Sequence, residues 1–206
     1  RRSYYADYSN PHLLVHNLEI VNDGAETMVF RTRHLTLHSL PEDLTLTDVG
    51  DVGDTPTCQS GFVTTPEKNA PPQHVSLCYD PLPKVITVPA NSKFERTFRM
   101  AVRRSADVAE AQADLASPPT FEEHQEAWGQ VDAAATITTG NKTLNEMVNA
   151  TLYSLRSSLR ADSRIPGSPG GLSTAGYFGL FFWDSELWIA NSLLLLNPDL
   201  AKTATS

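Results

Sequence analysis

The sequence predicts a protein of the β + α class, with a β-sandwich in its first half and helices in its second half. In residues 12–104, short runs of branched and aromatic residues are separated by segments rich in Pro, Gly and Asp, as in strands joined by turns. From residue 105 onward, apolar residues recur three and four positions apart, which is the spacing of a helix face. The length of 206 residues allows one large domain or two small ones.

The first two strands are expected on either side of a turn signal at Asn22-Asp23-Gly24. Residues 12–21 and 28–38 both alternate in polarity. We therefore expect these two runs to pair as a hairpin. The apolar side of the first run consists of Leu14, Leu18 and Ile20.

Further strands complete the predicted sandwich, while the remainder of residues 41–82 is rich in turn-forming residues and is expected to form loops. On this basis residues 1–104 are assigned to a β-sandwich domain. The further strands are expected at 61–65, 74–79 and 84–88, with a last one that includes Phe94, Arg96, Phe98, Met100 and Val102 on one parity.

The helical part begins with a linker, residues 105–140. Thr120 and Glu123 match the capping-box pattern of a helix start, and His124 and Trp128 follow one turn apart on the same helix. Pro198 is expected to end the last long helix, and a new one to begin near it. The other helices are expected at 105–116, 142–160 and 184–196, with an extended connector at 132–140.

Composition excludes several classes of partner. The net charge of −8 and the pI near 5.2 oppose non-specific binding to nucleic acid or to an anionic membrane surface. The most apolar stretch, Leu187 to Leu196, is shorter than the ~18 residues of a membrane span. The chain starts at Arg1 without a signal sequence and stops just after a predicted helix start, so we expect it to be part of a longer protein.

Cys58 and Cys78 are the only cysteines. They could form a disulfide that closes a loop of about twenty residues, or remain two thiols. Asn141 and Asn149 begin N-x-Thr glycosylation triplets. Together these features favour an extracellular or lumenal/vacuolar setting over the cytoplasm.

The segment 181–188 combines aromatic and acidic residues directly after a glycine-rich loop. Aromatic faces pack on the C–H surface of sugars, and carboxylates accept hydrogen bonds from sugar hydroxyls, so this segment is a candidate sugar site. The alternative is that the aromatic residues are core and Asp184 caps a helix. Asp184 and Glu186 would diverge by about 200° on a helix, so they are not expected to be a catalytic pair facing one glycosidic bond.

Other chemistry is not supported by the motifs. The residues around Ser173 lack the final glycine of a nucleophile elbow, and no nucleotide-binding loop is present. No cofactor is therefore expected. Four histidines on the two predicted hairpin strands could bind a metal, but no third type of ligand accompanies them, and we expect surface or core residues instead. They are His12, His16, His34 and His38.

Three segments resemble glycoside hydrolase family 65: residues 124–128, 171–179 and 182–188. This family contains acid trehalases, disaccharide phosphorylases and the glucosidase of collagen glucosylgalactosyl-hydroxylysine. The resemblance covers about residues 120–206, and the order of β-sandwich and linker helices also agrees. It implies that residues 141–206 are the start of a truncated (α/α)6 barrel catalytic domain.

The resemblance also implies the site residues. Trp183 and Asp184 match the Trp-Asp that lines the subsite of the non-reducing glucose. Tyr177 lies between Gly176 and Gly179 in a loop that shapes the same pocket. Glu186 matches the acidic position that follows.

Other positions complete what the resemblance implies. Many phosphorylase members have His where this chain has Leu180, which favours a hydrolytic member. The general acid Glu is expected beyond Ser206, so no catalytic residue is assigned here. Trp188 is expected to be core, and His124 and Trp128 are expected to pack the linker helix between domains.

The predicted function is cleavage of an α-glucosidic bond with inversion by the full-length parent, acting on trehalose as the first substrate or on a glucosyl conjugate. This chain would supply part of the glucose subsite and is not expected to turn over substrate by itself. The alternatives are an inverting disaccharide phosphorylase, a non-catalytic carbohydrate-binding module on the sandwich, and a structural or interaction domain.

Overall fold

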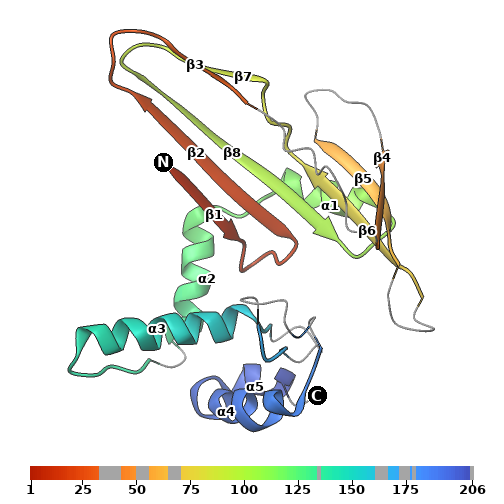
Figure 1. The fold of residues 1–206 in the computed structure, drawn as a ribbon, viewed down its shortest axis with the longest axis vertical. Coiled ribbons are helices and arrows are strands. Elements are labelled where there is room, and N and C mark those ends of the chain that lie inside the picture. Colours follow the sequence, from red (N-terminus) through yellow and green to blue (C-terminus); the bar gives the residue numbers. More distant parts are fainter. Residues whose placement is uncertain are drawn as a thin grey trace. The chain divides into compact units, whose positions relative to one another are not determined.

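A computed structural model describes residues 1–32, 43–49, 56–64, 71–133, 136–160, 167–171, 177 and 180–204. The chain divides into two units, Arg1–Ala127 and Trp128–Ser206. Figure 1 shows both units, coloured along the sequence. Among the described helices, none combines the length and the apolarity that a bilayer span requires.

The first unit is built on an antiparallel sheet with the strand order β1-β2-β8-β6-β5-β4, drawn in Figure 1. Strands β3 and β7 pair with each other in a separate two-stranded sheet. Antiparallel sheets of this kind are consistent with the expected β-sandwich domain. The strands are β1 (Arg2–Ala6), β2 (Leu13–Asn22), β3 (Met28–Arg31), β4 (Leu44–Val49), β5 (Thr57–Val63), β6 (Gln73–Tyr79), β7 (Val85–Val88) and β8 (Ser92–Arg103).

The predicted hairpin between residues 12–21 and 28–38 is wrong. Strand β2 pairs with β1 on one side and with β8 on the other, so both of its backbone edges are occupied. Strand β3 pairs with β7 instead, from Met28 opposite Val88 to Arg31 opposite Val85. Residues 33–38 of the predicted strand lie outside the described residues.

Asn22 explains why the chain leaves the sheet after β2. Its side chain is fully buried. Its Nδ2 donates hydrogen bonds to the carbonyl oxygens of Glu26, Val88 and Pro89 at 2.8, 3.0 and 2.9 Å, and its Oδ1 accepts from the Gly24 N–H at 3.1 Å. The predicted turn is therefore present. Its hydrogen bonds to Val88 and Pro89 hold it beside the end of β7, so β3 pairs with β7 and not with β2.

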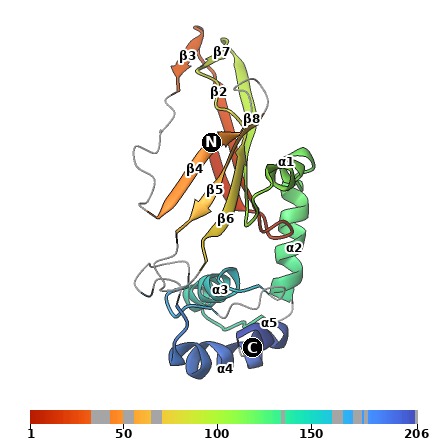
Figure 2. The same ribbon diagram turned by 90° about the vertical axis from the view of Figure 1, so that its right-hand side faces the viewer.

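One face of the sheet is covered by helix α1 (Val108–Ala116), which lies against the sheet in Figure 2. Leu13 and Val15 of β2 are buried there with Ala111 and Leu115 of the helix. The expected apolar side of β2 is thus not the one that faces α1, and Leu14 on it is 47% exposed. Both sides of β2 carry apolar residues near its start, so the sequence pattern does not show which side α1 buries.

Cys58 and Cys78 lie directly opposite each other on β5 and β6. Their Cα atoms are 4.1 Å apart, and they form a disulfide. Both are buried in the core beneath α1. The disulfide therefore joins two neighbouring strands inside the sheet, near the end of the pair where β5 begins and β6 ends.

An ion pair attaches α1 to the sheet. The Arg103 guanidinium donates two hydrogen bonds to the Asp114 carboxylate, at 2.6 and 2.7 Å. Asn10 Nδ2 donates to the same carboxylate at 3.0 Å. Asp114 is 7% exposed, so its charge is satisfied by partners rather than by water.

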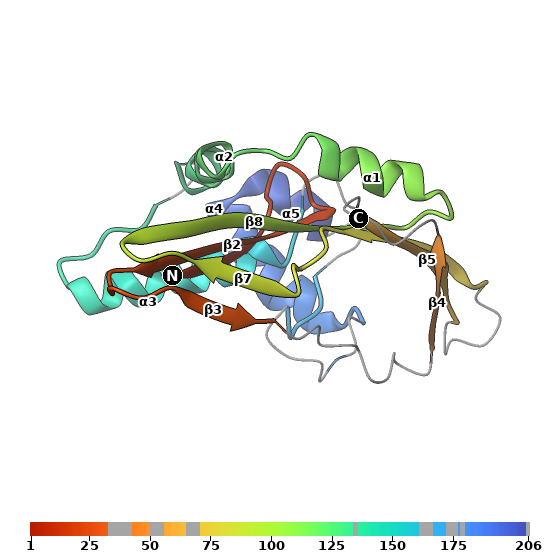
Figure 3. The ribbon, with the colours of Figure 1, turned by 90° about the horizontal axis from the view of Figure 1, so that it is seen from above.

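Helix α2 (Phe121–Ala133) begins with the predicted capping box. Glu123 Oε2 accepts from the Thr120 N–H at 2.6 Å, and Thr120 Oγ1 accepts from the Glu123 N–H at 3.2 Å. This part of the prediction is confirmed. The first turns of α2 lie on the same side of the sheet as α1 (Figure 3).

The regular elements described in the second unit are helices, and its core consists of Leu159, Ala190, Leu193, Leu200 and Ala201. The predicted helix 184–196 is present but starts with a π-helical turn. Pro198 opens a further helix, which agrees with the expected helix start. The (α/α)6 barrel remains an expectation. The elements are α3 (Lys142–Ser157), η1 (Ser185–Ala190), α4 (Asn191–Leu196) and α5 (Pro198–Ala204).

Candidate functional site

The candidate sugar site is positioned by a glycine segment that packs on the end of α3. A Cβ atom on Gly167 would lie 2.8 Å from Leu159 Cδ2, and one on Gly171 would lie 2.6 Å from Ser158 Oγ. Gly171 also has a φ of +52°, which a residue with a side chain rarely adopts. Gly171 is therefore favoured by both its backbone conformation and its close approach, whereas a side chain at Gly167 would require Leu159 to shift.

Ser185 connects the glycine segment to the aromatic cluster. Its side chain is fully buried, and its Oγ donates to the Gly167 carbonyl at 2.7 Å. Its backbone N–H donates to the Phe182 carbonyl at 3.0 Å. These two bonds position Trp183 and Asp184, which lie between the bonded residues in sequence.

The aromatic residues of the cluster are exposed. Trp183 is 59% exposed and Tyr177 is 41% exposed. The Trp183 and Trp188 rings meet edge to face with centroids 5.5 Å apart, and Tyr177 and Phe182 do so at 5.4 Å. Trp188 is 63% exposed, so the expectation that it is core is wrong for the described structure. Edge-to-face packing keeps part of each ring open to a ligand.

Asp184 is half-buried, and Glu186 is exposed. Asp184 has helical backbone angles and makes no side-chain capping hydrogen bond, so its carboxylate is not used as a helix cap. Ser185, between the two carboxylates, is buried. The turn that follows is π-helical, a rare form that occurs often at functional sites.

Several predicted residues lie outside the described residues. These are Gly176 and Gly179 of the site loop, Ser173, and His34 and His38 of the metal alternative. Of the other two histidines, His12 precedes β2, and the His16 ring stacks on Tyr4 at 4.1 Å. The described ranges contain no group of three or more metal-binding side chains.

The linker helix makes contacts within each unit. His124 contacts the turn between β1 and β2, where its Nδ1 accepts from the Tyr8 N–H at 3.2 Å. The Trp128 ring lies 5.0 Å from the Tyr153 ring of α3. Asp7, beside His124, was missed by sequence reasoning. Its signal is the Asp-Tyr-Ser-Asn sequence, since Asp commonly accepts hydrogen bonds from the backbone of the next residues in a turn.

One glycosylation triplet begins at the N-cap of α3, and the other lies within the helix. Asn141 caps this helix, and its Oδ1 accepts from the Leu144 N–H at 3.1 Å. Asn149 is exposed. Glycosylation at either residue stays a prediction.

A cavity of about 760 Å³ lies in the first unit, on the face of β1, β2 and β8. No predicted sugar-binding residue lines it, so we place the candidate site at the aromatic cluster instead. The residues that line the cavity include Tyr5, Asn17, Glu19, Thr97 and Phe121.

Comparison with known proteins shows the class of enzyme that this chain is similar to. No family model matches the chain. The relatives that it does match are enzymes named for acting on glucosides, namely glucosidases, disaccharide hydrolases and a trehalose phosphorylase. All these names are of the glycoside hydrolase family 65 type, so the resemblance is confirmed as a partial match.

Among these relatives, the protein-glucosylgalactosylhydroxylysine glucosidase of Dictyostelium discoideum is 27% identical over 98% of this chain. A kojibiose hydrolase of Mucilaginibacter mallensis is 38% identical over 39% of the chain, and the cell wall acid trehalase of Candida albicans is 32% identical over 39%. The chain spans 30%, 12% and 8% of the lengths of these three enzymes.

Proposed function

We propose that the chain is part of an enzyme that cleaves an α-glucosidic bond with inversion, and that it supplies one wall of the glucose subsite. In this proposal the exposed Trp183 ring stacks on glucose, and the Asp184 carboxylate accepts hydrogen bonds from its hydroxyls. The observation that supports it best is the pairing of an exposed Trp183 with an Asp184 that makes no capping bond. Tyr177, Gly179 and Glu186 are proposed to complete this wall.

The proposed chemistry needs a carboxylic acid that protonates the leaving oxygen while water attacks the opposite face of the sugar. We assign that acid to the part of the parent enzyme beyond Ser206. The residues described here would orient the sugar for this step, and correct orientation is itself a large part of catalysis.

Among substrates, we place a glucosyl conjugate before trehalose. The relative that matches 98% of this chain is named for a glucosylgalactosyl-hydroxylysine, whereas the trehalase matches 39%. Kojibiose and trehalose remain in the test as competing substrates. Leu180 at the position where many phosphorylases have His favours water over phosphate as the attacking group.

The test is Asp184→Asn in the full-length enzyme. We expect kcat/KM to fall at least about tenfold, because a hydrogen bond to a charged group contributes about 1.5–3 kcal/mol. The matched control is Asp199→Asn, because Asp199 lies on α5 with a side chain 81% exposed. Kinetics at the wild-type level in Asp184→Asn would contradict the proposed role.

The same enzyme preparation distinguishes the alternatives. Release of glucose from each substrate is followed with and without inorganic phosphate, and the anomer formed is read by NMR. Dependence on phosphate would favour the phosphorylase. Sugar binding without cleavage would favour the carbohydrate-binding module, and no binding to any glycan would favour a structural domain.

A further inference from the structure

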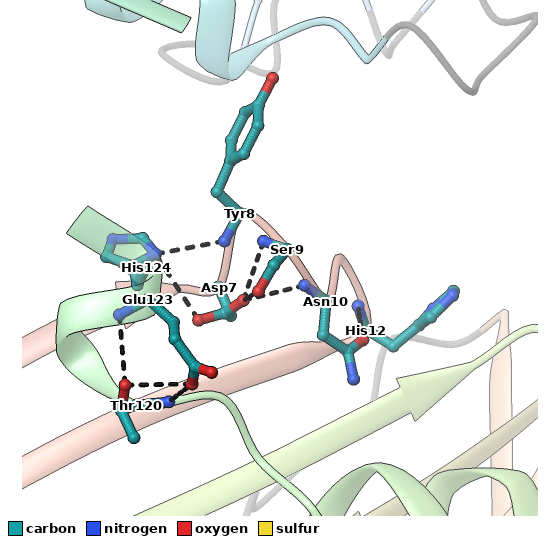
Figure 4. A network of polar contacts seen from close by, with 8 residues as sticks. All are labelled: Asp7, Tyr8, Ser9, Asn10, His12, Thr120, Glu123 and His124. Carbon is teal, nitrogen blue, oxygen red and sulfur yellow. Dashed lines mark hydrogen bonds and ion pairs between the residues drawn. The ribbon is translucent and has the colours of Figure 1, made fainter. Parts of the chain in front are cut away.

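A buried carboxylate and a buried imidazole meet where α2 approaches the turn between β1 and β2 (Figure 4). The Asp7 side chain is 0% exposed, and that of His124 is 11% exposed. Both belong to the first unit. The proposed glucose subsite does not use this pair, and Asp7 lies outside the segments that resemble a family.

The two oxygens of Asp7 have different surroundings. Oδ1 accepts three hydrogen bonds, from the Ser9 N–H at 2.9 Å, the Ser9 hydroxyl at 2.6 Å and the Asn10 N–H at 2.8 Å. Oδ2 is buried without a hydrogen-bond partner among the described residues. It lies 3.6 Å from His124 Nδ1. An acceptor is thus available beside the ring and is not used.

The ring nitrogen nearest to that acceptor is itself accepting. The Tyr8 N–H donates to His124 Nδ1 at 3.2 Å, so Nδ1 carries a lone pair and the imidazole is neutral. A proton added at Nδ1 would point a second donor at the Tyr8 N–H. The protonated ring therefore needs another acceptor, and Asp7 Oδ2 is the one within reach.

We propose that protonation of His124 exchanges its partner, from the backbone N–H of Tyr8 to the carboxylate of Asp7, and so moves the β1–β2 turn relative to α2. In the neutral arrangement the ring accepts from Tyr8. In the protonated arrangement Nδ1–H donates to Asp7 Oδ2, and the Tyr8 N–H loses its acceptor on the ring. The exchange is confined to one turn of backbone because Asp7 Oδ1 keeps its three donors.

The surroundings of the ring limit its other movements. The Tyr5 ring of β1 lies 4.4 Å from it and the Phe121 ring of α2 lies 6.0 Å from it. Of the acidic residues at the start of α2, Glu123 is bonded to Thr120, and Glu122 acts electrostatically on Tyr5. Asp7 is the charged group that acts on the His124 ring.

The pH range of the exchange follows from two opposing effects. Burial lowers the pKa of His124 below its ordinary value of 6.5, and the Asp7 carboxylate opposes this shift. Because burial is the larger effect, the exchange is expected on the acidic side of that value. The neutral arrangement is then present at neutral pH.

The test is an NMR titration of the full chain labelled with [15N]tyrosine, from about pH 8 to about pH 4, which spans the ordinary His pKa. We expect the Tyr8 amide shift to titrate with the same midpoint as the His124 ring. In Asp7→Asn, Oδ1 and its donors remain but the anionic acceptor is lost. The midpoint of His124 should then fall by about one pH unit or more.

Two further variants keep the test decisive if Asp7→Asn does not fold. His124→Gln provides a side-chain oxygen for the Tyr8 N–H and cannot be protonated, so its Tyr8 amide shift should not change with pH. His74→Gln alters an exposed histidine on β6 and should leave the Tyr8 titration unchanged. A Tyr8 amide that stays constant while His124 titrates would overturn the proposal, as would a Tyr8 titration that persists in His124→Gln.

Discussion

Single polar side chains determine the path of the chain at several points in the first unit. Asn22 is the clearest case, because one buried amide makes four hydrogen bonds to the two turns that lead into β3 and β8. Asp114 has a similar role between α1, β8 and the β1–β2 turn. Their partners depend on such groups, because these bonds lie in buried or partly buried surroundings where water replaces them only in part.

Replacing Asn22 with Ala should therefore destabilise the first unit strongly. Three carbonyl oxygens and one N–H would lose their partner, and we expect a loss of about 3 kcal/mol in the free energy of unfolding. Urea denaturation measures this change. Asn17→Ala is the matched control, because Asn17 is only half-buried and its hydrogen bond from the Thr97 hydroxyl is exposed. Equal losses in both variants would contradict the role given to Asn22.

Asp114 should make stability depend on pH. The hydrogen bonds from Arg103 lower the pKa of Asp114 below its ordinary value of 3.8. The folded carboxylate thus binds its proton less readily than the unfolded one. The contribution of this carboxylate to the free energy of unfolding is fully present above about pH 4. It is lost as the pH falls through the lower pKa that Asp114 has in the folded state.

The variant Asp114→Asn tests this dependence. At neutral pH we expect it to be less stable than the wild type by about 2 kcal/mol, as for hydrogen bonds to charged groups. In strong acid the difference should shrink, because the wild-type carboxyl is then also neutral. Unfolding free energies of both proteins across pH provide the measurement, and a difference that does not change with pH would contradict the assignment.

At the scale of elements, the sequence predicted most helices and strands but not how the strands pair. The capping box of α2 is local, so Thr120 and Glu123 alone were sufficient to predict it. The pairing of β3 with β7 depends on residues more than fifty positions apart, and periodicity carries no such information. Strands β1 and β4 were missed because the first begins before the apolar run and the second lies in a segment rich in turn residues.

The capping box offers a prediction at this scale. Thr120→Ala removes the acceptor of the Glu123 N–H and should reduce stability by about 1 kcal/mol. Thr120→Ser keeps a hydroxyl at the same place and serves as the control. Thermal unfolding monitored by circular dichroism compares the three proteins. A Ser variant as unstable as the Ala variant would show that the hydroxyl is not what matters.

Only the contiguous part of the candidate site could be predicted from the sequence. The motif around Trp183 and Asp184 is contiguous, so its residue types could be recognised in the sequence. The burial of Ser185 against Gly167 and the exposure of Trp188 depend on tertiary packing. No periodicity distinguishes an exposed tryptophan from a buried one.

At the scale of the whole molecule, the second unit leaves large apolar side chains exposed. Leu195 is 85% exposed and Met147 is 62% exposed, whereas Leu193 is 1% exposed. The relatives that the chain matches are several times longer than it is, since it spans 30% of the Dictyostelium enzyme. Exposed apolar area of this kind binds other surfaces or aggregates.

We therefore expect the 206-residue chain alone to bind the dye ANS, and Leu195→Lys to reduce that binding without loss of unfolding free energy. The control is Leu193→Lys, which places a charge in the core and should unfold the second unit. Fluorescence titration and urea denaturation measure the two effects. ANS binding that is the same in the wild type and Leu195→Lys would show that this surface is not available.

The π-helical turn at Ser185–Ala190 has a consequence for insertions and deletions. Residues five apart would diverge by about 140° on an α-helix, but a π-helical turn brings them onto one side. Trp183 and Trp188 are five apart, and their rings touch. Removing one residue between them would restore an ordinary helix with the two tryptophans four apart, about 40° from each other, so their contact would be kept. At the present spacing of five, the pairing of these rings therefore depends on the π-helical form of the turn, and a substitution that converts it to an α-helix at the same length would separate them.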